Sequence, residues 1–186
     1  MKRLYLLTAV FFMFALEASA QKVSIQTNIL DWAAIGTMNA EANVSIAQHF
    51  SLSLGGRYNP FTIGADREVP LKLQQRNVYA GARYWPWYVN SGWWFAAKVQ
   101  YIDYCRSGIL TKGSITGQNG RGAGLSAGYA FMLAPHFNLE LGAGACVNRY
   151  ERYIADIPGV EPMTDMIGTQ TFLEPDFLSF ALVFVF

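Results

Sequence analysis

Residues 38–47 read Met-Asn-Ala-Glu-Ala-Asn-Val-Ser-Ile-Ala, so every second side chain from Met38 to Ile46 is apolar. Residues 50–58 read Phe-Ser-Leu-Ser-Leu-Gly-Gly-Arg-Tyr and repeat the pattern. A period of two is that of a β-strand, whose side chains point alternately to opposite faces of a sheet. The two segments therefore predict two strands, each with one apolar and one polar face.

The same alternation recurs along the chain and predicts eight strands, about as long as a tilted transmembrane strand needs to be. The predicted strands cover residues 23–33, 38–47, 50–59, 78–84, 95–101, 124–131, 137–148 and 177–186. The connections alternate between short turns near residues 48, 87 and 135 and longer segments at 60–75, 104–120 and 149–174. This alternation of short turns and long loops is typical of bacterial outer-membrane barrels. We therefore predict an all-β fold, an eight-stranded antiparallel up-and-down transmembrane β-barrel with both termini periplasmic.

The first twenty residues have the pattern of a secretory signal peptide. Lys2 and Arg3 precede an apolar stretch at 4–16, and Ala18-Ser19-Ala20 forms a cleavage signature. The predicted organisation is a signal peptide at 1–20 and an outer-membrane barrel at 21–186, located in the cell outer membrane. The chain has 14 basic and 13 acidic residues, and cleavage would remove two basic residues and one acidic residue, leaving 12 of each. A neutral chain argues against nucleic acid as a partner.

Aromatic side chains gather where two membrane interfaces would lie, which predicts two girdles. The periplasmic girdle would hold Phe50, Trp85, Trp87, Tyr88, Trp93, Trp94 and Phe137, and the outer girdle Trp32, Tyr58, Phe61, Tyr101, Tyr104 and Tyr150. The last strand ends on Phe186 and resembles the signal that the barrel assembly machinery reads. Outer-membrane lipid and that machinery are the expected partners.

Charged residues fall on the face that points into the predicted barrel. This interior charge cluster consists of Glu41, Arg57, Arg83, Lys98 and Glu140. An eight-stranded barrel is just wide enough inside for side chains, so we expect these charges to pair as a structural plug. A lumen that conducts or binds a solute is the alternative, because Gly- and Ser-rich strands such as 122–128 could leave space inside.

The segment 149–176 is acidic, and we expect it to offer a surface for a protein partner on an extracellular loop. Its candidate residues are Glu151, Asp156, Glu161 and Asp165. Calcium binding is a weaker reading, because the loop has no Asp-x-Asp-x-Asp-Gly pattern. Cys105 and Cys146 would lie near the outer ends of two strands, and two readings stay open for them: a disulfide, or two separate thiols.

The two histidines, His49 and His136, fall in turns away from any serine that could act as a nucleophile. We therefore expect no enzyme activity, no catalytic residue, no metal and no cofactor. Each histidine opens a copy of one motif, since Ala47-Gln-His-Phe-Ser-Leu-Ser-Leu-Gly55 reappears as Ala134-Pro-His-Phe-Asn-Leu-Glu-Leu-Gly142. The repeat predicts two equivalent hairpins in one sheet.

Four short motifs carry a family resemblance: Thr27-Asn-Ile-Leu30, Arg57-Tyr-Asn-Pro-Phe61, Ala82-Arg-Tyr-Trp85 and Phe137-Asn-Leu-Glu-Leu-Gly142. With them the chain resembles a family of small outer-membrane proteins from Gram-negative anaerobes. That family is classed as a domain of unknown function and is sometimes encoded beside fimbrial genes. The resemblance implies a membrane barrel of OmpA/OmpX-type architecture and implies no catalytic residues.

Several functions remain open at this point. The leading one is a non-enzymatic barrel that contributes to envelope structure or surface interaction through extracellular loops. The alternatives are a small channel or solute-binding barrel, a lipid-modifying or proteolytic enzyme, and a soluble barrel in the periplasm or outside the cell.

Overall fold

A computed structural model describes residues 23–34, 36–64, 70–108, 113–156 and 168–186. Within these residues nine strands form one sheet, and a single short helix interrupts it. The strands are β1 (Val23–Asn28), β2 (Met38–Ala47), β3 (Phe50–Asn59), β4 (Thr62–Ile63), β5 (Leu71–Tyr84), β6 (Gly92–Ser107), β7 (Ser114–Ala134), β8 (Phe137–Asp156) and β9 (Gly168–Val185), and the helix is α2 (Ile29–Ala33). The predicted signal peptide lies outside the described residues.

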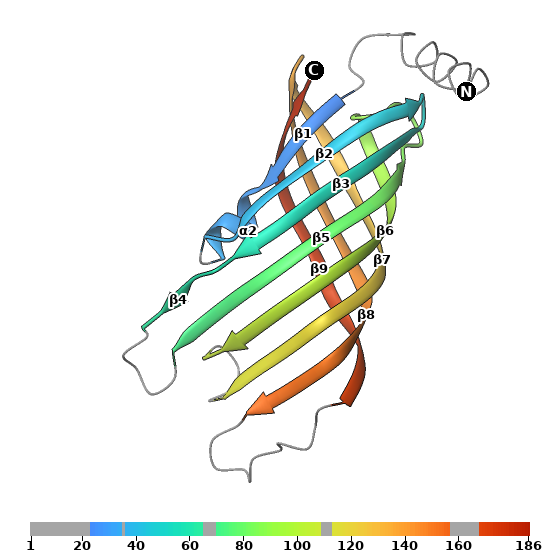
Figure 1. Cartoon of the computed structure of the whole chain (residues 1–186). Coiled ribbons are helices and arrows are strands. Elements are labelled where there is room, and N and C mark those ends of the chain that lie inside the picture. Colours follow the sequence, from blue (N-terminus) through green and yellow to red (C-terminus); the bar gives the residue numbers. More distant parts are fainter. Residues whose placement is uncertain (1–22, 35, 65–69, 109–112, 157–167) are drawn as a thin grey trace, which may run out of the picture.

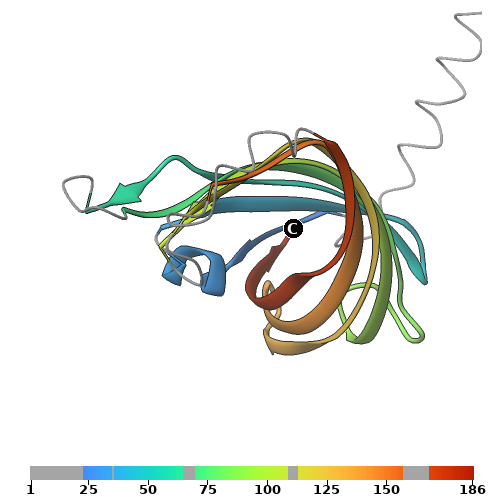
Figure 2. The ribbon, with the colours of Figure 1, turned by 90° about the horizontal axis from the view of Figure 1, so that it is seen from below.

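Eight of the strands close into a ring, which Figure 1 shows from the side and Figure 2 along its length. Each strand pairs antiparallel with the next, β3 pairs with β5, and β1 pairs with β9 to complete the circle. The two-residue strand β4 pairs only with the first two residues of β5. The predicted all-β, antiparallel, up-and-down arrangement with eight strands in a ring is confirmed.

The two ends of the ring differ. One end, here called the turn end, carries the connections at 48–49, 85–91 and 135–136, and the opposite end is called the extended end (Figure 1). An even number of strands returns the chain to its starting side. The Phe186 amide accordingly donates to the Val23 carbonyl over 2.9 Å at the turn end.

The internal repeat corresponds to two equivalent hairpins, as predicted. Each hairpin has a register shift one step before its turn, at Ser45/Ala47 and at Met132/Ala134. Nδ1 of His49 lies 3.0 Å from the Trp85 carbonyl oxygen, and Nδ1 of His136 lies 2.9 Å from that of Val185. Each histidine thus ties its turn to the adjacent strand.

The first strand is shorter than predicted. Strand β1 ends at Asn28, whose side-chain oxygen accepts from the Leu30 amide and caps helix α2. Asparagine at this position favours a helix start because its side chain replaces the missing backbone acceptor. The prediction of a strand continuing to Ala33 was therefore wrong.

On the other side of the ring the strands are longer than predicted. Strand β7 has 21 residues and β8 has 20, and both continue beyond the ends of β2 and β3. Much of the predicted loops at 60–75, 104–120 and 149–174 is therefore strand. The sheet forms a tall wall from β6 to β9, while β1 to β3 are short.

The two faces of the ring have opposite chemistry. Buried, inward-facing positions are mostly polar, whereas large apolar side chains are exposed on the outside, with Leu125 at 71%, Leu54 at 62% and Val99 at 61%. Backbone alternation produces this division because successive side chains of a strand point to opposite faces. Among the described residues no helix is both long and apolar enough to cross a bilayer.

Candidate functional site

Arg83 of β5 lies at the centre of the polar interior and links two glutamates. Its Nη1 lies 2.8 Å from Glu140 Oε2 on β8, and its Nη2 contacts Glu41 Oε1 on β2. The hydroxyl of Tyr79 donates to the second oxygen of Glu41 over 2.9 Å. All three charged side chains are 5% exposed or less. The ion pairs therefore join three sides of the ring, through β2, β5 and β8, away from water.

The remaining charges of the interior charge cluster surround Tyr79. The Arg57 guanidinium lies 5.9 Å from the centre of the Tyr79 ring, and the Lys98 ammonium lies 5.1 Å from it, so both cations contact its π-face. Arg57 also pairs with Asp31 of α2, at 2.9 Å between Nε and Oδ2. With Asp31 included, three acidic side chains balance the three basic ones.

Sequence reasoning missed Asp31 because it assigned residue 31 to a strand. The side chain reaches Arg57 only because Asn28 ends β1 and starts the helix. The capping pattern at Asn28, with an acidic residue in the first helical turn, was the available signal.

The turn end of the interior is filled by aromatic and amide side chains. Trp85 is 1% exposed and donates through Nε1 to Ser51 Oγ over 3.0 Å. Trp94 is fully buried beneath Arg83, whose Cζ lies 4.7 Å from the indole ring. The buried Asn138 donates to the Asn90 carbonyl over 2.6 Å and holds the 85–91 connection across this end.

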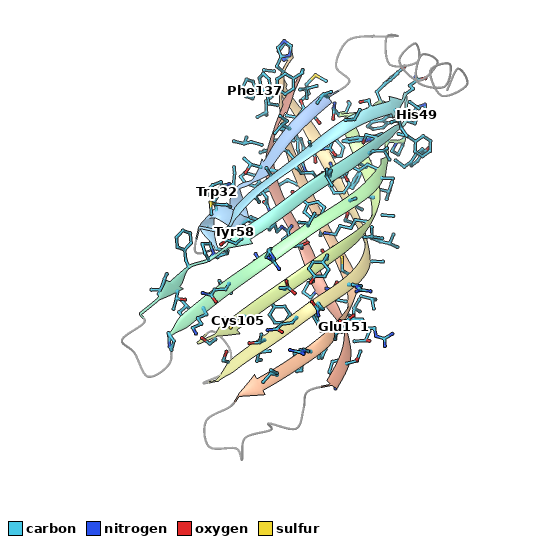
Figure 3. All side chains as sticks on the ribbon, in the orientation of Figure 1. Trp32, His49, Tyr58, Cys105, Phe137 and Glu151 are labelled. Carbon is cyan, nitrogen blue, oxygen red and sulfur yellow. The ribbon has the colours of Figure 1, made fainter. Side chains whose placement is uncertain are left out.

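The girdle prediction was therefore partly wrong. Trp85, Trp94, Tyr104 and Tyr150 are buried inside the ring. Trp94 and Tyr104 both occupy inward positions of β6, where even-numbered residues from 94 to 104 face inward or are half-buried, so alternation rather than nearness to a turn decides their direction. The other predicted girdle residues are exposed, and Figure 3 shows Phe137 near the turn end and Trp32 and Tyr58 further from it.

A chain of amide groups crosses the interior toward the extended end. Asn77 donates to Gln100 over 3.0 Å, Gln100 donates to Asn148 over 2.8 Å, and Asn148 donates to Glu174 over 2.6 Å. These four residues come from β5, β6, β8 and β9. The chain therefore ties four strands together with side-chain hydrogen bonds.

Two tyrosines pack beside the end of this chain. Tyr150 donates to the Glu174 carboxylate over 2.6 Å, and its ring meets that of Tyr104 edge to face with 5.0 Å between centroids. Burial, together with the charge of Glu174, raises the pKa of Tyr104 to about 12. Burial and the hydrogen bond to Glu174 likewise raise the pKa of Tyr150 well above the ordinary value. Both phenols are therefore neutral in this site.

The glycines of β7 and β8 make room for these interior side chains. A Cβ at Gly142 would lie 2.7 Å from the Trp94 ring, and a Cβ at Gly122 or Gly124 would meet the side chain of Asn148 or Cys146. The space above the glycine-rich segment 122–128 is thus occupied by neighbouring side chains. Residues 122–128 had suggested empty space inside the ring, and these side chains occupy that space.

A comparison with protein-family models identifies one match, described as "Protein of unknown function (DUF3575)", over residues 6–186. The chain belongs to this family. The expected assignment to a domain of unknown function is thereby confirmed for DUF3575. Searches of curated proteins and of solved structures gave no match.

The described part of the predicted partner surface of this DUF3575 chain lies on strand rather than loop. Glu151 is on β8, accepts from Asn119 Nδ2 over 3.1 Å and lies 3.5 Å from Arg121. Asp156 ends the same strand, while Glu161 and Asp165 lie outside the described residues. Figure 3 shows Glu151 toward the extended end.

The two cysteines of the DUF3575 chain are not joined by a disulfide. Cys105 pairs with Thr116 of β7, whereas Cys146 pairs with Gly124 of the same strand. Eight residues of strand separate these partners, which corresponds to roughly 26 Å. A disulfide needs Cα atoms within about 7 Å, so the sheet register excludes the bridge.

The histidines of the DUF3575 chain serve the two turns, because Nδ1 of each contacts a backbone carbonyl. In the parts of the chain that the structure describes, no group of three or more His, Cys, Asp or Glu side chains is placed to hold a metal ion. The side chains inside the ring pair their charges and fill the interior.

Proposed function

We propose that this chain is a transmembrane β-barrel of the cell outer membrane, with the turn end in the periplasm and the extended end outside. The observation that carries the proposal is the inverted burial: Arg83 is 3% exposed inside the ring, while Leu125 is 71% exposed outside it. Soluble proteins rarely expose a continuous apolar surface of more than a few hundred Å². In the proposed barrel, membrane lipid would cover the apolar outer surface.

The height of the apolar band supports a bilayer as the solvent. On β8 the outward residues run from Phe137 through Leu141 to Val147, after which Arg149 and Glu151 follow. Ten residues of strand span roughly 33 Å, or about 25 Å along the ring axis at a tilt near 40°. That height is close to the apolar band of known outer-membrane barrels.

The role that best fits this interior is structural and non-enzymatic. Side chains from three sides of the ring meet at Arg83, and the indole of Trp94 lies directly against it. A barrel filled in this way would contribute to the envelope, and its tall wall from β6 to β9 would present a surface to partners outside the cell. No cofactor is needed for either role.

A substitution on the outer face tests the membrane proposal directly. In lipid, Leu125→Arg would place a charge inside the apolar band, between its middle and its outer edge, and cost about 1–3 kcal/mol of unfolding free energy. Thr169→Arg on β9 is the matched control, because Thr169 is exposed beyond that band. In water the same change at Leu125 would be close to neutral.

The readouts are membrane fractionation and gel migration of unboiled and boiled samples. We expect the natural chain in the outer-membrane fraction with a band that shifts on heating. Leu125→Arg should lose much of the folded band, while Thr169→Arg should keep it. A soluble protein without a heat shift, in which Leu125→Arg is harmless, would overturn the proposal.

Conductance distinguishes a filled barrel from a channel. We expect planar-bilayer recordings to show no discrete conductance steps for the natural chain, because Arg83 and its two glutamates join three sides of the interior. Regular steps that change in size in Arg83→Ala would instead assign the chain to the small-channel class.

A further inference from the structure

Two arginines lie side by side on the outer surface of the tall wall. Arg121 of β7 pairs directly with Arg149 of β8, and Tyr101 of β6 pairs with Arg121 on its other side. Both arginines are exposed, and the Arg121 side chain is 74% accessible. Glu151 lies 3.5 Å from Arg121 and balances one of the two charges. Like charges placed directly opposite each other destabilise a strand pair, and a bound anion would remove that repulsion.

The next outward row toward the turn end is small and apolar. In register across five strands it consists of Ala80, Val99, Ala123, Val147 and Leu173. These residues line an open groove with a volume of about 700 Å³. An adjoining hollow shares Ala80 and Val99 and extends to Tyr101 and Arg121. The apolar groove is therefore continuous with the arginine row.

We propose that this surface binds a phosphorylated membrane lipid, with an acyl chain in the groove and the phosphate on Arg121 and Arg149. Planar guanidinium groups suit phosphate oxygens because they donate two parallel hydrogen bonds. The step from the apolar groove to a row of one tyrosine and two arginines matches the step from acyl chains to the interface and headgroups of a lipid leaflet. A free phosphate would use only the arginines and would leave the groove without a role.

The proposal rests on the proposed function, since it needs the arginine row at the level of the lipid headgroups. The Arg121–Arg149 pair follows directly after the apolar band on both strands, with Ala123 and Val147 as the preceding outward residues. Lipid is therefore the occupant to test first. A protein partner or free phosphate would give a different result in the same experiment.

The test is native mass spectrometry of the folded full chain released from detergent micelles. The probes are dilauroyl phosphatidic acid, dilauroylglycerol with the same chains and no phosphate, and inorganic phosphate. The variants are R121Q/R149Q, which removes the paired charge, and Ala123→Phe, which fills the groove. The matched control is Arg152→Gln, an exposed arginine on β8 outside this row.

We expect the natural chain and Arg152→Gln to retain phosphatidic acid in preference to dilauroylglycerol. R121Q/R149Q should bind phosphatidic acid about tenfold more weakly or worse, because two charge-assisted hydrogen-bonding groups are lost. Ala123→Phe should weaken binding of both lipids. Equal retention of the two lipids, or an equal loss in Arg152→Gln, would overturn the proposal.

Two further outcomes separate the possible failures. Inorganic phosphate that binds as tightly as phosphatidic acid would assign the arginines to a soluble anion and overturn the lipid site. A chain that is soluble without detergent and shows no heat shift would overturn the membrane proposal and this one together. A heat-modifiable chain without a headgroup preference would overturn this one alone.

Discussion

Removing the charge at Arg83 should destabilise the protein more than any other single change in the interior charge cluster. In Arg83→Met the apolar stem is largely preserved, but Glu41 and Glu140 lose the cation that both contact. Glu41 keeps the hydroxyl of Tyr79, which only partly compensates. Breaking a buried ion pair by deleting one partner costs about 3–5 kcal/mol. A loss near 4 kcal/mol lowers the folded-to-unfolded ratio roughly a thousandfold.

The assay is urea unfolding of the purified chain in lipid vesicles, followed by the heat-modifiable band. The triple variant Arg83→Met/Glu41→Gln/Glu140→Gln tests the cause, because it removes the uncompensated charges together with the cation. We expect the triple variant to recover most of the loss, since buried charge networks can be replaced by neutral groups at little net cost. The slope of the unfolding free energy against urea concentration should be the same in all variants, so that their urea midpoints can be compared directly.

Arg76→Met is the matched surface control. Arg76 pairs with Asp103 at 2.9 Å, but its side chain is 67% exposed and solvent screens the pair. Its unfolding midpoint should stay near that of the natural chain. The reasoning fails if Arg83→Met costs less than about 1 kcal/mol, or if the triple variant is as unstable as the single one.

Three further predictions concern packing, thiols and ionisation. Gly142→Val should sharply reduce the folded band, because its side chain would clash with a buried indole, whereas Ala143→Val, which faces outward, should leave the band unchanged. Cys105 and Cys146 should give identical migration on reducing and non-reducing gels, and a reducible internal crosslink would contradict the register. Because the pKa of Tyr104 is raised from 10 to about 12, its contribution to stability is complete below pH 10 and is lost as the pH rises to about 12. Phenolate absorbance should show a titration step near pH 12, and this step should be absent in Tyr104→Phe.

Strands β2 and β3 were predictable from sequence because one of their faces is apolar from end to end. The same signal stops early on β5 and β6, where the outward residues change from Val78 and Tyr101 to Arg76 and Asp103. At this level the outward face becomes polar while Ile102 and Tyr104 are buried inside the ring, so the phase of the apolar alternation changes and no longer marks one continuous strand. The tall wall was therefore read as loops, although its backbone pairing continues without interruption on β5 and β6.

The interior charge cluster was predictable as a set but not as a network. Alternation places Glu41, Arg83 and Glu140 on one face, and the structure brings them into contact from three strands. Alternation cannot reveal that Trp94 packs against Arg83, because it gives the face on which a side chain lies and not the residues that it meets across the ring. Asp31 was missed because its direction depends on a helix of only five residues.

Neighbouring strands of the ring are joined by unequal numbers of residue pairs. Among the described residues, β1 is held by four residue pairs to β2 and five to β9, whereas β7 and β8 share eighteen. The two smallest seams of the ring thus lie on either side of β1, so the ring closes only when β1 has paired with both β2 and β9. Until then the sheet has two unpaired margins that could recruit other chains. Assembly is consequently a late, whole-chain event, and any opening under strain should begin beside β1.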